Sequence, residues 1–477
     1  MFETGVRQIR LAVGMLSGRR LSTRNLGRLV ADAVTTLAEF GEPGAEAQQL
    51  LGGPQADPET RQDFAERGLR RTARRLAVRS PFYARRLAGG PTEPGALDVD
   101  KLRAIPVTTK RDLIERPGDF VCTDAERYLS TRTTGTTGRP AEIWLSRYEM
   151  DLWSGLGALA SVIRDELRPT DVMAVNMSSR AIAATHLTAA TCRLAQSGCR
   201  LLGVLPPDDA LDSLCGGGAT VLATYPSYLA ELVVAAQARG IGPDDFKLRR
   251  ITVGGEVLSP ALSDAARRTF GVPQLDDSYS MTEVIPVTGR TCSERHVHHD
   301  LNTGLVEVLD LVSGEPAAPG ALGTLVITPY FPYRDCMPVL RYDTRDVVRC
   351  LPDEPLTCEL AGTPGTSQIL GKDGSLIRLG PSEVITPRQL IDAIESLPTR
   401  PWPARYRAAE SGGRLRITLP TAAIEGFGES ATRHHLAEAG VDAELVIVGD
   451  DQAAELRRTR SDLHEVSFAM PAALIGA

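Results

Sequence analysis

The chain has 477 residues, of which 42% are hydrophobic and 24% charged, a composition that indicates a globular protein of two or more domains. Its formal net charge of −7, with no basic block, excludes nucleic acid as the main partner, because phosphate binding needs clustered lysines and arginines. No apolar run approaches the roughly 18 residues of a membrane span, the first residues lack a signal-peptide pattern, and the eight cysteines are too scattered for a secreted disulfide framework, so we expect a cytoplasmic protein with no membrane partner.

Helical patterns come first along the chain, and alternating helices and strands follow. Residues 1–90 place apolar residues at helical spacing among arginines, which predicts helices. The arginines at 70–86 indicate either a solvated helix face or an oligomer contact, such as a homodimer would have. From about residue 145 the two patterns alternate, which predicts a layered α/β domain. Its predicted helices are 152–163 and 230–240, its predicted strands are 172–177 and 249–255, and residues 304–330 predict a hairpin around the turn "SGEP".

The pattern changes after about residue 372. A helix is predicted at 388–397, a hairpin around Gly412 and Gly413, and a helix followed by a strand at 433–449. The fold prediction is therefore α/β, with a large multi-layer N-terminal domain at 1–370 and a small, mobile α+β C-terminal domain at 371–477. Residues 1–65 form a helical extension of the large domain.

The stretch "RTTGTTGRP" (132–140) has a composition that no packed core needs. Glycines allow backbone amides to turn inward, threonine hydroxyls add hydrogen-bond donors, and Arg139 can neutralise charge, so the stretch is suited to wrapping phosphate oxygens. A Walker A loop needs Lys and then Ser or Thr, whereas here Arg139 precedes Pro140. A polar surface turn is the alternative interpretation.

Four more motifs follow in a fixed order. "VGGEVLSP" (253–260) ends a strand in Gly254, Gly255 and Glu256, and "SYSMTEV" (278–284) orders an aromatic ring, a hydroxyl and a carboxylate. An aromatic ring can stack on a base, and a glutamate can hold Mg²⁺. "RYDTRD" (341–346) offers a carboxylate able to grip two ribose hydroxyls, and "LGKDGSLIRLG" (370–380) carries Lys372 and Asp373 at the predicted domain junction. Each motif alone also has a purely structural interpretation, as core filler, turn or solvated charge.

Taken together, the five motifs resemble those of the adenylate-forming acyl-CoA synthetase superfamily. Within it the chain looks most like the phenylacetate–CoA ligase branch, because "SPFYARRL" (80–87) and "IPVTTKRDL" (105–113) match that branch's N-terminal segments. Arg345 also stands where most of the superfamily carries glycine, and the C-terminal domain is short. The resemblance covers roughly residues 65–470.

The resemblance implies an AMP-forming ligase. A small, aryl or phenylacetate-like carboxylate would attack the α-phosphate of ATP to give acyl-AMP and pyrophosphate, and coenzyme A would then displace AMP while the C-terminal domain rotates as a lid. The implied catalytic residues are Thr136, Thr282, Glu283 (also the Mg²⁺ ligand) and Arg460. The implied nucleotide-binding residues are Thr133, Thr134, Gly135, Thr137, Gly138, Arg139, Gly254, Gly255, Glu256, Tyr279 (beside adenine), Ser280, Asp346 (on ribose) and Lys372.

One departure from the family pattern concerns the lysine near the end of the small domain, which bridges the carboxylate and the α-phosphate. The matching stretch here is "LRRTRSDLHEV" (456–466), which puts Asp462 at the lysine position, and no lysine follows Lys372 anywhere. One explanation is that Arg457, Arg458 or Arg460 substitutes, although an arginine fork differs from a point charge. The others are modified chemistry, such as amide ligation or nitrite-dependent diazotisation of an aryl amine in secondary metabolism, and a catalytically silent nucleotide-binding relative.

A candidate zinc site completes the set. "CSERHVHH" (292–299) spaces Cys292 and His298 as zinc-binding members of the branch do, and "EPLTCEL" (354–360) keeps Cys358 but has Leu356 where those members have another cysteine. Cys350 is the predicted fourth ligand, with Cys336 and His296 as alternatives. The alternative to a structural zinc is a set of small buried thiols with histidines on a surface loop.

Overall fold

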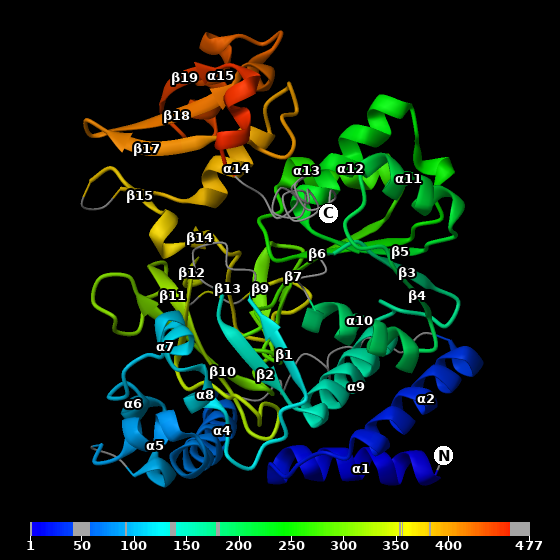
Figure 1. Ribbon diagram of the computed structural model, residues 1–477, viewed down its shortest axis with the longest axis vertical. Coiled ribbons are helices and arrows are strands. Elements are labelled where there is room, and N and C mark those ends of the chain that lie inside the picture. The colour runs from blue at the N-terminus through cyan, green and yellow to red at the C-terminus, as the bar shows by residue number, and fades with distance from the viewer. Residues whose placement is uncertain are drawn as a thin grey trace, which may run out of the picture. The chain divides into compact units, whose positions relative to one another are not determined.

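The computed structural model describes residues 2–41, 58–90, 93–133, 140–177, 182–352, 354, 356–380 and 383–457. These residues form both helices and β-sheets, which confirms the predicted α/β class (Figure 1). The chain forms two compact units. Unit 1 comprises residues 1–173, 179–201 and 278–368, and unit 2 comprises residues 174–178, 202–277 and 369–477. The division into a large and a small domain near residue 370 stays a prediction.

The first part of unit 1 is helical, as its arginine-rich pattern predicted. Its helices are α1 (Phe2–Ser17), α2 (Thr23–Phe40), α4 (Pro58–Arg79), α5 (Pro81–Leu87), η1 (Pro94–Ala96), α6 (Val99–Leu102), α7 (Lys110–Glu115) and α8 (Pro117–Phe120). Pro81 does not merely interrupt the run but begins α5, with the side chain of Ser80 capping the helix by accepting from Tyr83 N. Tyr83 is fully buried in the main core of unit 1.

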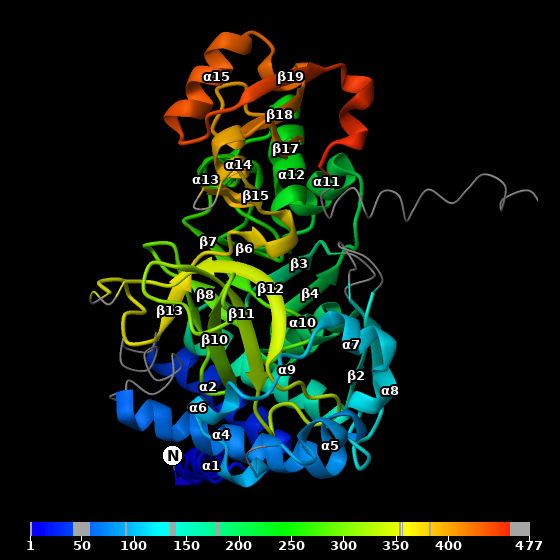
Figure 2. The ribbon, with the colours of Figure 1, turned by 90° about the vertical axis from the view of Figure 1, so that its left-hand side faces the viewer.

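The remaining helices and strands of unit 1 begin at residue 129. They are β1 (Leu129–Arg132), β2 (Glu142–Leu145), α9 (Arg147–Ile163), α10 (Ile182–Leu194), β4 (Gly198–Leu201), β8 (Gly289–Thr291), β9 (His296–His299), β10 (Gly304–Asp310), β11 (Leu322–Pro329), β12 (Tyr342–Arg349) and β13 (Gly365–Ser367). Strands β10, β11 and β12 pair antiparallel, as Figure 2 shows, and the turn "SGEP" lies between the first two as predicted. Strand β9 pairs antiparallel with β8 and with β13.

Two strands pass from one unit to the other. They are β3 (Val172–Val175) and β7 (Gln274–Tyr279), whose last residues, Ser278 and Tyr279, lie in unit 1 and pair with β8. Unit 2 contains α11 (Pro207–Gly216), β5 (Val221–Thr224), α12 (Pro226–Arg239), η2 (Pro243–Asp245), β6 (Arg250–Gly254) and α13 (Pro260–Phe270). Strands β5 and β6 are parallel neighbours, and their apolar residues Leu222, Ile251 and Val253 are buried in one core with residues of α12 and α13.

The C-terminal part of unit 2 has the predicted mixture of elements. They are β14 (Gly371–Lys372), η3 (Asp373–Ser375), β15 (Ile377–Arg378), β16 (Val384–Ile385), α14 (Pro387–Glu395), β17 (Arg407–Ser411), β18 (Arg414–Pro420), η4 (Thr421–Ile424), α15 (Glu429–Glu438), β19 (Glu444–Val448) and η5 (Asp450–Glu455). The predicted hairpin is β17–β18, and its turn uses Gly412 and Gly413 because both residues have positive φ, +62° and +78°. Strand β19 adds to β18 in parallel.

A network of buried charges joins α9 to the segment after β11. The side chains of Glu149 and Arg334 are both 0% exposed, and Arg334 Nε lies 3.6 Å from Glu149 Oε1. The Glu149 carboxylate also accepts from the backbone amides of Ser146, Asp335 and Cys336 at 2.7, 2.8 and 3.0 Å. Each buried charge thus has compensating partners, which a buried ion needs to be tolerated. Among the described helices, none combines the length and the hydropathy that crossing a membrane requires.

Candidate active site

The threonine- and glycine-rich stretch connects the two strands of a hairpin. Strands β1 and β2 pair antiparallel, and Thr133 N donates to Ala141 O at 3.0 Å while Ala141 N donates to Thr133 Oγ1, also at 3.0 Å. These two bonds hold the ends of the connection side by side. The other predicted residues of this stretch lie outside the described residues: Thr134, Gly135, Thr136, Thr137, Gly138 and Arg139.

Tyr279, Glu283 and Asp346 converge in unit 1. The hydroxyl of Tyr279, at the end of β7, donates to Asp346 Oδ2 on β12 at 2.9 Å. The hydroxyl of Tyr342, also on β12, donates to Glu283 Oε1 at 3.4 Å. Both carboxylates are buried, with Glu283 3% and Asp346 6% exposed. Two acids and two phenols from segments more than 50 residues apart therefore share one environment.

The electrostatics of this cluster keep the phenols protonated. Burial, reinforced by the nearby Asp346 carboxylate, raises the pKa of Tyr279 well above its usual value. Burial and the neighbouring Glu283 carboxylate raise the pKa of Tyr342 in the same way. Each phenol therefore stays a hydrogen-bond donor and orients the carboxylate that it contacts.

Two residues that sequence reasoning missed shape this cluster. Thr344 Oγ1 accepts from Asp346 N at 3.0 Å and donates to Leu325 O at 2.8 Å, which fixes the backbone under the acid. Gly289 on β8 lies in register between Tyr279 and His299, and a Cβ there would stand 2.5 Å from the Val297 side chain and 3.3 Å from Tyr279 Cβ. The glycine thus leaves room for the Tyr279 and His299 rings, which pack edge to face with their centroids 6.0 Å apart.

Other predicted residues near the cluster are less enclosed. Ser280 is exposed, and Thr282 is half-buried in the turn that follows β7. The rest of the predicted nucleotide set belongs to unit 2, where Gly254 ends β6 and Gly255 has a φ of +81°. Glu256 there accepts from Ser227 N at 2.9 Å, which joins the ends of two parallel strands, and Lys372 lies in β14. The carboxyl edge of parallel strands is where ligands bind in open α/β sheets.

A four-residue cluster of thiols and imidazoles lies in unit 1, and it differs from the prediction at one position. Cys292, His298 and Cys358 come together as predicted, but the fourth member is His296, and the four ligand atoms lie within 4.8 Å of one another. Cys350, the predicted fourth ligand, is outside this cluster because it follows β12, where its thiol contacts Ala317 O at 3.6 Å. Of the candidates for the fourth position, the structure brings His296, the alternative, and not Cys350 beside the other three.

The geometry of the cluster suits a tetrahedral ion. The ring N–H of His298 Nδ1 donates to Thr363 O at 2.7 Å, so Nε2 is an acceptor, and it accepts from Cys358 Sγ at 3.3 Å. The backbone N–H of His296 donates to Cys292 Sγ at 3.2 Å, and burial lowers the pKa of His298, which favours the neutral imidazole. In a tetrahedral zinc site the ligand atoms lie about 3.3–3.8 Å from one another, as the zinc bond lengths require. The four ligand atoms here would therefore need to move only slightly closer together to bind zinc.

The arginines proposed to replace the missing lysine are only partly described. Arg457 is engaged within unit 2, where its guanidinium donates to Ala404 O at 3.3 Å and lies 5.9 Å from the centre of the Tyr406 ring. Arg458, Arg460 and Asp462 lie outside the described residues. Arg457 in this arrangement therefore serves packing of unit 2.

Comparisons with known proteins agree with the geometry. Residues 128–330 match the family model of the AMP-binding enzyme. Phenylacetate-coenzyme A ligase of Pseudomonas putida is 26% identical over 280 residues, 57% of this chain and 62% of that protein. The enzyme of the same name from Thermus thermophilus is 27% identical over 308 residues, 61% of this chain and 66% of that protein. The match thus spans slightly under two thirds of the length of these relatives.

Solved structures establish the fold. A crystal structure of 2-hydroxyisobutyryl-CoA ligase in the postadenylation state, in complex with 2-HIB-AMP, has a TM-score of 0.71 at 19% identity and covers 84% of this chain and 88% of that one. The same ligase in complex with 2-HIB-AMP and CoA in the thioesterification state has a TM-score of 0.59 at 20% identity, over 85% and 89% of the two chains. These findings confirm the predicted resemblance to the phenylacetate–CoA ligase branch of the adenylate-forming superfamily.

Proposed function

We propose that this chain, similar to AMP-binding enzymes over residues 128–330, is an ATP-dependent, AMP-forming ligase. It would activate a small carboxylate, aryl or phenylacetate-like, and transfer the acyl group to coenzyme A. The observation that carries the proposal is the buried pair of acids, Glu283 and Asp346, each oriented by a tyrosine hydroxyl. Enzymes that catalyse displacement at phosphorus do so mainly by holding hydrogen-bond donors, acceptors and charges in fixed positions around the reacting atom.

Each group in the cluster has a task that its chemistry fits. Asp346 would accept the two ribose hydroxyls, and the Tyr279 ring, held by its hydroxyl, would lie beside adenine. Glu283 offers a hard oxygen ligand for Mg²⁺, which supplies neutralising charge to the phosphates when it is bound. Thr282 would contact the α-phosphate, and the β1–β2 connection, with Thr136, would close over the outer phosphates.

The reaction would run in two displacements. A carboxylate oxygen of the substrate attacks the α-phosphorus and pyrophosphate leaves with the bond electrons. The coenzyme A thiolate then attacks the acyl carbonyl and AMP leaves. Gly254, Gly255, Glu256 and Lys372 would also contact the nucleotide, and Arg460 would replace the missing lysine.

A second candidate function rests on the absence of any lysine after Lys372. The family's bridging cation draws two anions together, and an aspartate at that position would repel both. If no arginine substitutes, the same nucleotide chemistry would serve another acceptor: an amine, giving an amide, or nitrite, giving a diazo group on an aryl amine. A protein that binds nucleotide without reacting is the third candidate.

We also propose a structural zinc ion at Cys292, His296, His298 and Cys358. The support is the convergence of two thiols and two imidazoles, with His298 oriented by Thr363 O. Zinc favours such tetrahedral N and S ligands, whereas the cation of the reaction is Mg²⁺ with oxygen ligands.

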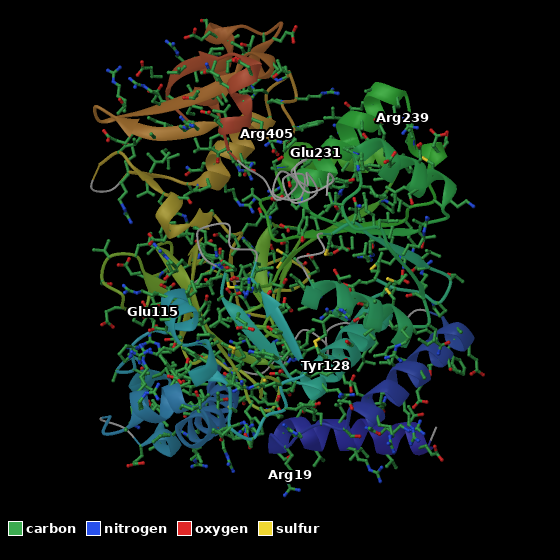
Figure 3. All side chains as sticks on the ribbon, viewed as in Figure 1. Arg19, Glu115, Tyr128, Glu231, Arg239 and Arg405 are labelled. Atoms are coloured by element: carbon green, nitrogen blue, oxygen red, sulfur yellow. The ribbon has the colours of Figure 1, made fainter. Side chains whose placement is uncertain are left out.

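Pyrophosphate release tests the proposal. The purified protein is incubated with MgATP and a panel of aryl and arylacetic acids, with and without coenzyme A, an amine or nitrite. Release with an acid and a thioester only with coenzyme A supports the leading function, and an azo-coupling product only with nitrite supports the second. Glu283→Gln should abolish release while Tyr128→Phe should not, because Tyr128 is an exposed residue before β1 (Figure 3). ATP binding without release under any condition would contradict both.

A further inference from the structure

Strand β12 contains a bulge opposite Leu325 of β11. The two strands are antiparallel neighbours (Figure 2), and their register shifts within this stretch. On one side of the shift Thr324 pairs with Val347. On the other side Val326 pairs with Asp343. Three residues of β12 therefore lie opposite the single residue Leu325, namely Thr344, Arg345 and Asp346.

The bulge includes an unusual backbone conformation at Arg345. Its φ is +56°, and among the described non-glycine residues with a positive φ it is the one that lies inside a strand. A residue with a side chain adopts this left-handed conformation only where its surroundings compensate the cost, and such residues gather at functional sites. The side chain of Arg345 is exposed, so its burial does not explain the conformation.

Hydrogen bonds within the bulge and across to β11 hold this shape. Arg345 N donates to Asp343 Oδ1 at 2.9 Å. Asp346 N donates to Thr344 Oγ1 at 3.0 Å, and the Thr344 hydroxyl donates in turn to Leu325 O at 2.8 Å. Because the regular pairing of the two strands is interrupted at Leu325, the threonine hydroxyl supplies this carbonyl with a donor.

The residue that follows the left-handed position is the buried acid of the candidate active site. Asp346 is 6% exposed, and its Oδ2 accepts from the Tyr279 hydroxyl at 2.9 Å. The dihedral angles of Arg345 set the direction in which the chain enters Asp346. Bulges beside active sites commonly re-aim a side chain in this way.

We infer that Arg345 is a positioning residue whose left-handed backbone aims the Asp346 carboxylate at the ribose of the nucleotide. The inference rests on the proposed function, in which Asp346 accepts the ribose hydroxyls. The requirement is for a backbone conformation and not for a charge. Glycine and asparagine adopt the left-handed region readily, whereas valine does not, because its branched Cβ clashes with the backbone there.

Three substitutions separate the conformation at position 345 from its charge, because all of them remove the guanidinium. Arg345→Gly and Arg345→Asn allow the left-handed conformation, and Arg345→Val opposes it. We therefore expect the first two variants to keep Asp346 in place and the third to displace it.

Discrimination between ATP and 2′-deoxy-ATP reports the position of the Asp346 carboxylate. A hydrogen bond from a ribose hydroxyl to a carboxylate corresponds to about 10- to 100-fold in affinity, so the wild type should prefer ATP by that factor in calorimetric titrations with Mg²⁺. Arg345→Gly and Arg345→Asn should keep this preference, whereas Arg345→Val should lose it, as Asp346→Ala should. If Arg345 only stabilised the fold, its substitution would weaken both nucleotides equally and leave their ratio unchanged.

A milder pair of variants acts on the same bulge and decides the matter if Arg345→Val does not fold. Asp343→Asn keeps an oxygen that can accept from Arg345 N, whereas Asp343→Ala removes that acceptor. The first should preserve the preference for ATP and the second should lower it. In the Asp346→Ala background Asp343→Ala should change neither affinity, because its effect passes through the missing carboxylate. Circular dichroism verifies that each variant is folded.

Crystal structures of the nucleotide-free variants keep this test separate from the proposed ligase activity. Arg345→Gly should retain the contact between the Tyr279 hydroxyl and Asp346 Oδ2, and Arg345→Val should lose it. The inference is overturned if folded Arg345→Val keeps either this contact or the preference for ATP, or if Arg345→Gly loses either of them. It is also overturned if the wild type binds the two nucleotides equally. If the wild type binds no MgATP, the proposed function fails, and the crystallographic comparison still decides whether position 345 places Asp346.

Discussion

Replacing Tyr279 by phenylalanine removes one oxygen atom from the candidate active site and leaves the aromatic ring in place. The lost hydroxyl donates to Asp346 Oδ2 at 2.9 Å, and a hydrogen bond to a charged group contributes about 1.5–3 kcal/mol. Thr344 Oγ1 still holds the Asp346 backbone, so we assign about half of this, about 0.75–1.5 kcal/mol, to the orientation of the carboxylate for ribose. That free energy corresponds to a loss in affinity for MgATP of about four- to twelve-fold.

Calorimetric titration of MgATP into the two proteins measures this loss directly. Tyr279→Ala should weaken binding further, by about 1–3 kcal/mol, because it also removes the stacking surface for adenine. Tyr128→Phe is the matched control: Tyr128 is 50% exposed and its ring stays beside the Arg147 guanidinium, so affinity should not change. If folded Tyr279→Phe binds MgATP within two-fold of the wild type, the orienting role of the hydroxyl is refuted.

Three further outcomes are expected. Arg334→Met leaves the Glu149 carboxylate buried without its cation and should lower the free energy of unfolding by about 3–5 kcal/mol in urea titrations, and the double variant with Glu149→Gln should recover part of it. Metal analysis of protein purified without chelators should find one zinc per chain, lost in Cys358→Ser and kept in Cys350→Ser. Burial raises the pKa of seven of the ten tyrosines, namely Tyr83, Tyr148, Tyr279, Tyr330, Tyr333, Tyr342 and Tyr406. The stability that these tyrosines contribute is therefore complete below pH ~10 and falls as the pH rises above it. Alkaline unfolding followed by tyrosine absorbance at 295 nm will measure this fall.

Local patterns were enough to predict most helices and hairpins. The helix ending at Gly240 is α12, because the glycine adopts a left-handed φ of +66° that closes it. The hairpin of β17 and β18 follows from two adjacent glycines with positive φ. Such features depend on a few neighbouring residues, so their physical causes are visible in the sequence.

The partners within the site depend on contacts between distant segments, and the sequence predicted them only in part. Motif order made Tyr279, Glu283 and Asp346 candidates for nucleotide binding, but it did not show that the hydroxyls of Tyr279 and Tyr342 orient the two acids. The sequence left the fourth member of the thiol–imidazole cluster open between Cys350, the predicted ligand, and His296, because the choice depends on how distant strands pack around β9. The need for a glycine at position 289 could not be predicted from the sequence, because it follows from the register of β7, β8 and β9.

If zinc binds as proposed, strand β9 would give the protein a dependence on a trace metal that takes no part in its reaction. Its alternation turns His296 and His298 toward the thiols, while the next residue, His299, meets the Tyr279 ring. A zinc ion at this site would therefore restrain the strand whose His299 contacts the Tyr279 ring, which we propose lies beside adenine. Protein from zinc-starved cells would then be folded but would bind nucleotide more weakly. Preparations from different growth media would differ in apparent ATP affinity.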